Sequence, residues 1–500
     1  MQSQIMVDLD HPLGQINPCI YGQFAEHLGT CIYDGFWVGL DSPVPNLNGI
    51  RADVVEALKK LRIPVLRWPG GCFADDYHWQ DGIGPRETRP CRLNIHWDAE
   101  ESNEFGTHEF FELCRQLDCE PYICGNLGSG TVREMRDWLE YMNSERDTTL
   151  TRLRAENGSS DPLGVRYFGI GNENWGCGGN FSPEFYAEEY RRYASFANLA
   201  GGNFLFKIAC GANADDYDWT QRFFATMVGR TDERNRCHLA TGYALHYYAG
   251  TAGNSFEYTE DQWYQLLAQA LRIEPILLRH RQIMDQFDPQ KKVWVIVDEW
   301  GTQHPPLPGT NPHWSKSQNT IRDALVAALT LDIFNRHAKI VYMANIAQVV
   351  NNGHAMVFTE GEQFVLTPTY HVYEMYTPHQ GAQSLKMQVS TGSIPYSPPL
   401  GSTPLPPVPH IAGSCSRRGT VVTLSIVNAH ISEYADVTVD WRGNGNPSLR
   451  SWRVLTAPDI HAHNSFEEPE VVIPREVDCE SIGATLSVPP ASVNVMQYEI

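Results

Sequence analysis

The stretch VRYFGIGNE, residues 165–173, is a short apolar run that ends in an asparagine and a glutamate. A run of this kind is typical of a buried strand. Shortly after it, Ser182, Pro183 and Glu184 supply a helix N-cap, a proline at the first helical position and an early acid. The stretch therefore predicts a strand followed by a helix, which is the repeating unit of α/β proteins.

The same alternation continues on both sides, from about residue 18 to residue 376. Apolar residues share one helix face in two of the intervening stretches, with Val54, Val55, Leu58 and Leu61 in one and Ile321, Leu325, Ala328 and Ile333 in the other. Eight runs are expected to be strands: 20–24, 64–69, 120–126, 165–173, 204–212, 239–248, 292–300 and 339–345. Eight such units predict a (β/α)8 TIM barrel over residues 18–376, with its reactive groups at the C-terminal ends of the strands.

After Tyr376 the pattern changes to period-two alternation with almost no helical periodicity. Val422, Leu424 and Ile426 alternate with polar residues, as expected for antiparallel strands with one buried face. A segment rich in Pro, Ser and Gly, residues 390–409, is expected to be a long surface loop. The sequence therefore predicts a C-terminal β-sandwich over residues 377–500.

The chain carries 38 basic and 59 acidic residues, a net charge of -21 that would repel nucleic acid and anionic membranes. No stretch approaches the roughly 20 apolar residues that cross a bilayer, and the start MQSQIMVDLD lacks the features of a secretory signal. We expect a cytoplasmic protein, or a secreted one if a signal was trimmed, that acts on a neutral substrate. The 12 cysteines include no CxxC pair, so we expect buried free thiols rather than a zinc site or a disulfide framework.

Two of the predicted strands end in a glutamate, Glu173 in GNENW and Glu299 in VDEW. Either one alone could be a solvated carboxylate at a loop end. Together, at the same rim of a barrel and about 5 to 5.5 Å apart, they could serve as the acid/base and the nucleophile of retaining glycoside hydrolysis. This chemistry needs no metal or organic cofactor, because the two carboxyl groups supply both the proton and the nucleophile.

More specific blocks narrow the function: YGQFAEHLG (21–29), RWPGGCFADDYHWQDGIGP (67–85), GIGNENWGCGG (169–179), LHYYAG (245–250), VDEWGT (297–302) and AQVVN (347–351). With them the chain closely resembles, essentially end to end, the α-L-arabinofuranosidases of glycoside hydrolase family fifty-one. The resemblance implies exo-acting release of terminal α-L-arabinofuranosyl units from oligo- and polysaccharides. It also implies a strand from residues 1–17 that joins the C-terminal sandwich, and a homo-oligomer.

The resemblance also implies roles for individual residues. Glu173 matches the acid/base, Glu299 the nucleophile, Asn172 an asparagine that binds the sugar 2-hydroxyl, and Tyr248 a tyrosine that donates to the nucleophile. Asn172 could instead cap a turn, and Tyr248 could be a core residue.

Four further positions match residues of the sugar pocket. Glu26 and Gln348 match residues that hold the furanose hydroxyls, Cys72 lines the pocket, and Trp97 lies in the region that meets the leaving group. The alternatives are a salt-bridge partner for Glu26, a surface position for Gln348 and a core position for Trp97.

Two neighbours of the carboxylates are expected to support them. Arg67 should brace the acidic rim, and His246 should be a hydrogen-bonded strut beneath the nucleophile. Relatives often carry an aromatic residue shortly after the nucleophile, whereas this chain reads GTQH at 301–304, which leaves the wall near the leaving group undefined. An endo-acting glucanase or xylanase on the same barrel, or a non-catalytic carbohydrate-binding protein, are the alternative functions.

Overall fold

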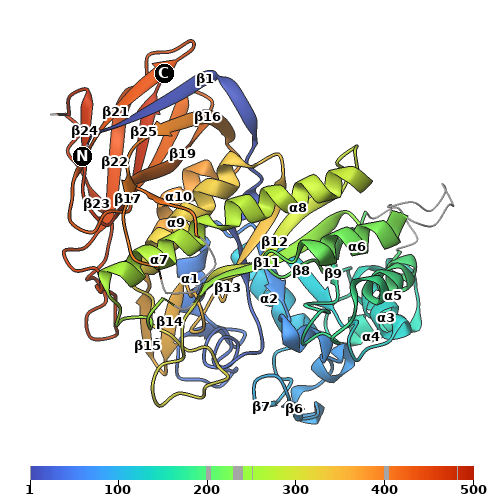
Figure 1. The fold of residues 1–500 in the computed structure, drawn as a ribbon. Helices are drawn as coiled ribbons and strands as arrows, with labels where there is room; N and C mark the ends of the chain where they lie inside the picture. Colours follow the sequence, from blue (N-terminus) through green and yellow to red (C-terminus); the bar gives the residue numbers. More distant parts are fainter. Residues whose placement is uncertain (1, 199–203, 229–239, 251, 399–404, 481) are drawn as a thin grey trace.

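The computed structural model describes residues 2–198, 204–228, 240–250, 252–398, 405–480 and 482–500. Eight parallel strands close into a barrel (Figure 1). They are β2 (Gly22–Phe24), β5 (Val65–Trp68), β8 (Glu120–Gly125), β9 (Tyr167–Ile170), β10 (Phe206–Ala209), β11 (Gly242–Gly250), β12 (Trp294–Gln303) and β13 (Val341–Ala347). Each predicted run overlaps one of these strands, although β11, β12 and β13 extend two or three residues beyond the predicted ends and residue 239 lies outside the described residues. The predicted TIM barrel is confirmed.

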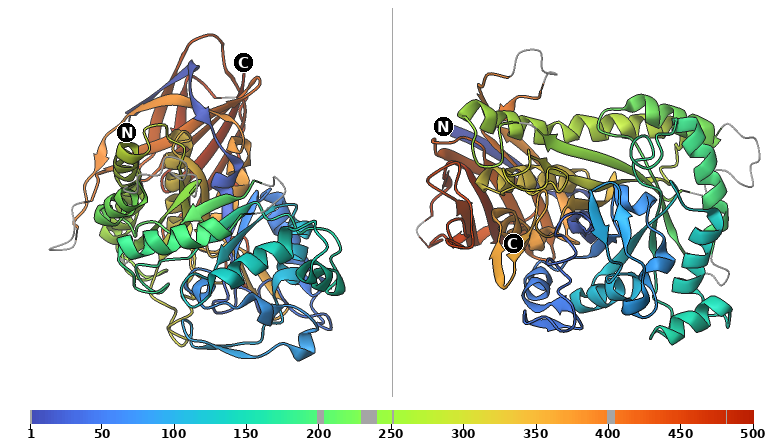
Figure 2. Two further views of the ribbon diagram at one scale, coloured as in Figure 1. Left: turned by 90° about the vertical axis from the view of Figure 1, so that its right-hand side faces the viewer. Right: turned by 90° about the horizontal axis from the view of Figure 1, so that it is seen from below.

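Ten α-helices are described, most of them in the connections between barrel strands (Figures 1 and 2). They are α1 (Ala52–Lys60), α2 (Thr107–Leu117), α3 (Val132–Asn143), α4 (Thr149–Glu156), α5 (Pro183–Phe196), α6 (Tyr217–Val228), α7 (Glu260–Leu271), α8 (Ile273–Phe287), α9 (Ile321–Arg336) and α10 (Pro368–Tyr376). The predicted start of α5 is confirmed, since the Ser182 hydroxyl accepts a hydrogen bond from the Phe185 amide. None of the described helices is long and apolar enough to cross a membrane.

The C-terminal part of the chain forms a nine-stranded mixed sheet that includes the N-terminal strand. Its order is β23-β22-β25-β20-β19-β16-β1-β21-β24. The strands are β1 (Gln2–Gln15), β16 (Gln383–Ser390), β19 (Ile411–Arg418), β20 (Val421–Asn428), β21 (Ala435–Arg442), β22 (Ser448–Thr456), β23 (Arg475–Glu476), β24 (Thr485–Val488) and β25 (Ser492–Glu499). β1 pairs antiparallel with β16 and parallel with β21, so the blue strand in Figures 1 and 2 runs among orange and red ones.

Helix α9 joins the barrel to this sheet, and it is buried on all sides from Ile321 to Asn335. Asp332 of α9 accepts hydrogen bonds from the hydroxyls of Ser414 and Ser425, at 2.7 and 2.6 Å. For this reason β20 is buried on both faces, not on one face as its alternating sequence predicted.

Among the described residues, four two-stranded sheets lie outside the two main sheets. The hairpin β6 (Arg92–Asn94) and β7 (Ala99–Glu101) lies near the barrel, with β3 (Asn46–Leu47), β4 (Ile50–Arg51), β14 (Val357–Glu360) and β15 (Gln363–Leu366) forming two others. The segment 390–409 is not wholly irregular, because β17 (Ser393–Ile394) pairs with β18 (Val408–Pro409). Ile394 and Val408 are buried there, which the Pro-rich composition did not indicate, and residues 399–404 lie outside the described residues.

Candidate active site

The two glutamates singled out in the sequence converge at one end of the barrel. Glu173 follows the end of β9, and Glu299 lies on β12. One carboxylate oxygen of each and a ring nitrogen of His246 lie within 4.8 Å of one another. Retaining glycosidases hold their two carboxyl groups about 5 to 5.5 Å apart, whereas inverting ones leave about 6.5 to 9.5 Å for a water. The spacing fits the retaining arrangement.

A cavity of about 290 Å³ opens beside these carboxylates. Seven of the residues predicted for the site line it: Glu26, Cys72, Trp97, Glu173, Tyr248, Glu299 and Gln348. Pockets for drug-sized molecules span about 300 to 1,000 Å³, so this cavity lies at the small end of that range. It has room for about one sugar ring rather than for a run of them.

Glu26 lies in the wall of this cavity and is 2% exposed. Its Oε1 accepts hydrogen bonds from the Gly71 amide and the Trp97 indole, at 3.0 and 3.2 Å, and its Oε2 accepts one from Gln348 Nε2 at 2.9 Å. Burial, helped by the nearby charge of Glu299, raises the pKa of Glu26 to about 7. These contacts fit neither the salt-bridge alternative for Glu26 nor the surface alternative for Gln348.

The carboxylate of Glu299 is held by two donors from other strands. The Tyr248 hydroxyl donates to Oε1 at 2.8 Å, and Arg67 Nη1 donates to Oε2 at 3.1 Å. Both bonds stabilise the ionised form, which is the form a nucleophile needs. The backbone of Gly71 packs closely against the same carboxylate, because a Cβ at this position would lie only 2.9 Å from Glu299 Oε2. Arg67 thus braces the acidic rim as the sequence predicted.

Asn172 shares Arg67 with Glu299 as a hydrogen-bond partner, and its side chain is buried. Its Oδ1 accepts a short hydrogen bond from Arg67 Nη2, at 2.6 Å. Its Nδ2 has no partner among the described residues. A buried amide N–H without a partner is costly, so Nδ2 is a donor available to a bound sugar hydroxyl.

His246 contacts the carboxylates of both Glu173 and Glu299 rather than that of Glu299 alone. Its Nδ1 lies 2.8 Å from Glu173 Oε1 and 3.5 Å from Glu299 Oε2, and its Nε2 lies 3.2 Å from Asp298 Oδ1. Burial opposes the charged ring, but these three carboxylates outweigh it and raise the pKa of His246 to about 10. Burial and the charge of Glu299 raise the pKa of Glu173, although the hydrogen bond with His246 opposes them. Glu173 is therefore suited to hold a proton.

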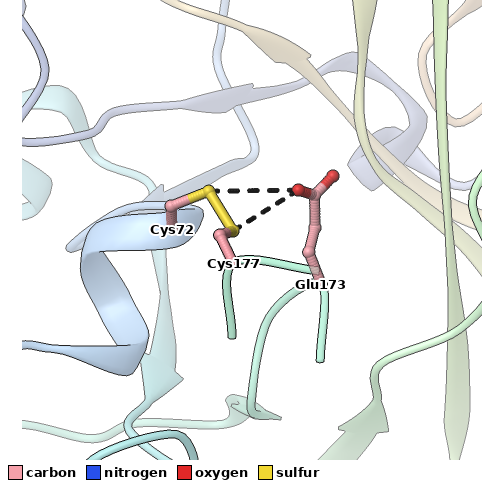
Figure 3. Close-up of side chains that lie close together, drawn as sticks. All are labelled: Cys72, Glu173 and Cys177. Carbon is pink, nitrogen blue, oxygen red and sulfur yellow. Dashed lines mark hydrogen bonds between the residues drawn. A yellow bond between two sulfur atoms is a disulfide. The ribbon is translucent and has the colours of Figure 1, made fainter. Parts of the chain in front are cut away.

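Cys72 is not a free thiol, so the prediction of buried free cysteines is wrong here. It forms a disulfide with Cys177, and the two sulfurs lie 4.0 and 3.6 Å from Glu173 Oε2 (Figure 3). The two cysteines are 105 positions apart in the sequence, so the sequence does not show that the connections after β5 and β9 meet at the pocket. Neither sulfur carries a hydrogen, so neither donates a hydrogen bond to Glu173. Nine other described cysteines are free.

Two groups of side chains in the described residues have the spacing of metal ligands, Cys72 with Glu173 and Cys177, and Glu173 with His246 and Glu299. The disulfide removes the thiolates that a metal would require from the first group. In the second group, the raised pKa of His246 keeps its ring protonated, and a protonated ring has no lone pair to offer. Neither donor set fits a metal ion.

Sequence reasoning missed three residues around the carboxylates. Asp298 is buried beside Glu299, where it accepts a hydrogen bond from the Tyr122 hydroxyl at 2.6 Å. The charges of Arg67 and His246 outweigh burial and lower the pKa of Asp298. Trp175 lines the cavity, and Asp75 lies beneath it. Asp298 and Trp175 adjoin or nearly adjoin the two glutamates in sequence, which is the signal that could have identified them.

The wall that the sequence left undefined includes Thr302 and Gln303 of β12. Trp300, which directly follows Glu299, is buried and does not line the cavity. Aromatic side chains of the cavity lining come instead from Trp97, Trp175 and Tyr248.

Two family models match the chain. The α-L-arabinofuranosidase 1 domain matches residues 57–248, and the α-L-arabinofuranosidase C-terminal domain matches residues 298–492. An intracellular exo-α-L-arabinofuranosidase from Bacteroides ovatus is 42% identical over 490 residues, 96% of this chain and 92% of the relative.

Solved structures agree along the whole chain. The GH51 arabinofuranosidase from Xanthomonas axonopodis pv. citri has a TM-score of 0.93 and 41% identity, with 100% of both chains covered. An α-L-arabinofuranosidase from Thermotoga maritima, solved as an arabinose complex, has a TM-score of 0.85 and 29% identity, again over 100% of both chains. The chain therefore belongs to the α-L-arabinofuranosidases of glycoside hydrolase family 51, retaining exo-acting enzymes that release arabinofuranosyl residues.

Proposed function

We propose that Glu299 is the nucleophile and Glu173 the acid/base of this α-L-arabinofuranosidase. The observation that carries the assignment is the difference between their surroundings. Tyr248 and Arg67 donate hydrogen bonds to Glu299 and favour its ionised form, whereas burial raises the pKa of Glu173 and favours its protonated form. Two carboxyl groups whose environments favour opposite protonation states divide the acid and nucleophile roles between them.

In the first step the Glu299 carboxylate attacks the anomeric carbon, and the glycosidic C–O bond breaks. Glu173 gives its proton to the departing oxygen, which leaves a β-arabinofuranosyl ester on Glu299. In the second step the Glu173 carboxylate takes a proton from a water, whose oxygen attacks the anomeric carbon. The ester breaks, α-L-arabinofuranose leaves, and both glutamates return to their starting states.

The remaining pocket residues bind and orient the sugar. Asn172 Nδ2 is the free donor next to Glu299, so we assign it the 2-hydroxyl. Glu26 and Gln348 form one hydrogen-bonded unit, and Gln348 Oε1 is buried with no partner among the described residues, so this unit suits the other furanose hydroxyls. Trp97, fixed by its bond to Glu26, faces the leaving group.

The natural substrate is, in our proposal, an oligo- or polysaccharide with terminal α-L-arabinofuranosyl units. The small cavity supports removal of one sugar at a time, and it does not support endo cleavage of glucan or xylan, which needs an open cleft. A bifunctional glucanase-xylanase with a TM-score of 0.60 is only 12% identical, so that likeness concerns the fold alone. We propose a cytoplasmic location, supported by the Bacteroides ovatus relative, which is described as intracellular, and a homo-oligomer, supported by the family resemblance.

Hydrolysis of p-nitrophenyl α-L-arabinofuranoside, followed by proton NMR from the first seconds, tests the proposed pair. We expect α-L-arabinofuranose as the first product, with the β anomer appearing only by mutarotation, because two displacements at one carbon restore its configuration. If the β anomer appears first, the two carboxylates do not act as proposed.

Tyr248→Phe tests the support of the nucleophile. We expect kcat/KM to fall about tenfold to a hundredfold, because a hydrogen bond to a charged group contributes about 1.5 to 3 kcal/mol. The adjacent Tyr247 offers a matched control, since its hydroxyl donates to the Gln269 carbonyl at 2.5 Å, away from the site. Tyr247→Phe should keep wild-type kinetics. If Tyr248→Phe also has wild-type kinetics, Tyr248 serves only for packing.

A further inference from the structure

Asp75 is a buried carboxylate that does not line the cavity and has no part in the mechanism above. It is the last residue of the 3-10 helix η2 (Cys72–Asp75), which follows β5, and it is 3% exposed. Four N–H groups surround its two oxygens. A buried carboxylate with so many donors holds several segments of chain at once.

The four donors come from the connections after two other barrel strands. Oδ1 accepts from the amides of Leu127 and Gly128, at 2.7 and 2.8 Å, in the connection after β8. Oδ2 accepts from the Asn172 amide at 2.7 Å and from Asn174 Nδ2 at 3.1 Å, in the connection after β9. Glu173 therefore lies between two residues, Asn172 and Asn174, that donate hydrogen bonds to Asp75.

The chain after β9 closes tightly around this carboxylate. A Cβ at Gly178 would lie 2.3 Å from Asp75 Oδ2 and 1.9 Å from the Asn172 carbonyl oxygen, so only glycine fits there. Asn174 Nδ2 also donates to the Gly178 carbonyl at 2.6 Å. The same segment is joined to η2 a second time, through the Cys72–Cys177 disulfide (Figure 3).

Glu173 needs such a support, because its own backbone conformation is unfavourable. Its φ is 42°, in the left-handed region that few non-glycine residues adopt. A residue in this region is strained and stays there only when its surroundings hold it. The hydrogen bonds that Asp75 accepts from Asn172 and Asn174, the residues on either side, are among the contacts that hold it.

We propose that Asp75 is a positioning residue for the acid/base: its carboxylate fixes the main chain on both sides of Glu173 and so directs the Glu173 carboxyl group toward the glycosidic oxygen. This inference rests on the proposed role of Glu173. Asp75 touches no substrate and moves no proton; it acts only through the geometry of residues 172–174.

The requirement is for a carboxylate, not merely for a polar group of that size. An ionised carboxylate only accepts hydrogen bonds, which matches the four donors; burial raises the pKa of Asp75 to about 7, and the hydrogen bonds from these donors oppose that rise. In Asp75→Asn, the amide nitrogen would face either the donors from Asn172 and Asn174 or those from Leu127 and Gly128. The new amide N–H group would then face N–H groups that now donate to Asp75, while the volume of the side chain hardly changes.

The test compares wild type with Asp75→Asn on a series of aryl α-L-arabinofuranosides whose phenols differ in pKa, and on an arabino-oligosaccharide. A displaced acid matters most when the leaving group needs a proton. We expect kcat/KM to fall about tenfold or more for the oligosaccharide, which is part of the about 10² to 10⁴-fold that acid–base catalysis contributes. For a dinitrophenyl leaving group it should fall less than about threefold, so the dependence on phenol pKa becomes steeper.

Asp332→Asn is the matched control. Asp332 is also fully buried and accepts only from neutral donors, the hydroxyls of Ser414, Ser425 and Tyr376, but it lies between the barrel and the C-terminal sheet. This variant should have the wild-type dependence on phenol pKa. A loss in Asp75→Asn by the same factor for every substrate, as in a merely destabilised enzyme, would overturn the proposal.

Asn174→Ala provides a second route if Asp75→Asn does not fold, which its thermal melting curve would reveal. It removes the side-chain donor to Asp75 and leaves the Asn172 amide bond in place, so we expect a smaller change of slope in the same direction. An unchanged slope would contradict the proposal. Glu173→Ala distinguishes a failure of the proposed acid/base from a failure of the role of Asp75. If Glu173→Ala does not show a steeper dependence of kcat/KM on phenol pKa, the proposed acid/base is wrong. If Glu173→Ala shows it and Asp75→Asn does not, only the role of Asp75 is wrong.

Discussion

Glu299→Ala is expected to abolish formation of the glycosyl-enzyme for every substrate, however good its leaving group. The variant has no atom that can bond to the anomeric carbon on the side opposite the departing oxygen. Removing the nucleophile of another covalent enzyme costs about 10⁶-fold in kcat, and we expect a loss of this order. The measurement is kcat/KM on dinitrophenyl and p-nitrophenyl α-L-arabinofuranosides, together with mass spectrometry of the enzyme after rapid quenching.

Glu299→Gln is the control for shape. Its amide keeps the volume and can still accept a hydrogen bond from Tyr248 or Arg67, but it lacks the negative charge that attacks the sugar. Both variants should melt as cooperatively as the wild type and show no adduct. An adduct on either variant with the dinitrophenyl substrate would place the nucleophile on another residue.

The barrel could be predicted because its signal is local. Each strand is a short apolar run, each helix has an apolar face, and Ser182 with Pro183 marks a helix start by residue type alone. The ends of the runs also predicted where Glu173 and Glu299 would lie, since parallel strands of a barrel bring their C-terminal ends together. Such inferences need only neighbouring residues and the rules of strand order.

The disulfide and the surroundings of Asp75 could not be predicted in this way. Cys72 and Cys177 meet only because the connections after β5 and β9 fold over the same pocket, and nothing local indicates their 5.5 Å Cα separation. Asp75 occurs in FADDY beside Asp76, and residue type does not tell which of the two is buried. Only the positions of Asn172 and Leu127 distinguish them.

Tertiary context also changed two local expectations. Apolar and polar residues alternate in β20 as in a strand with one solvent-exposed face. Ser425 is nevertheless buried, because its hydroxyl donates a hydrogen bond to Asp332 of α9. His246 was expected beneath the nucleophile, yet its closest carboxylate is that of Glu173. Polar residues at the junction of two layers are the ones that a sequence pattern assigns least well, since their partners come from other parts of the chain.

Glu173→Ala should separate the two chemical steps. Without the acid, kcat/KM is expected to fall about 10² to 10⁴-fold for oligosaccharides, whereas activated phenols, which leave without a proton, should still glycosylate Glu299. The second step then lacks its base, so the β-arabinofuranosyl ester should accumulate and be visible by mass spectrometry. The wild-type enzyme should lose kcat/KM at alkaline pH as Glu173 loses its proton, and the raised pKa of Glu173 moves that loss to higher pH. With an activated phenol the variant should lack this alkaline loss.

Added azide distinguishes Glu173 from Glu299 most sharply. Azide is a small anion that needs no deprotonation, and the shortened side chain leaves room for it on the face of the sugar where Glu173 acts. Attack by its nitrogen on the anomeric carbon breaks the ester, frees the Glu299 carboxylate and yields α-arabinofuranosyl azide. We expect this product and faster turnover from Glu173→Ala with a dinitrophenyl substrate, and neither from Glu299→Ala. If Glu299→Ala were the variant that azide rescues, with a β-azide as product, the two roles would be reversed.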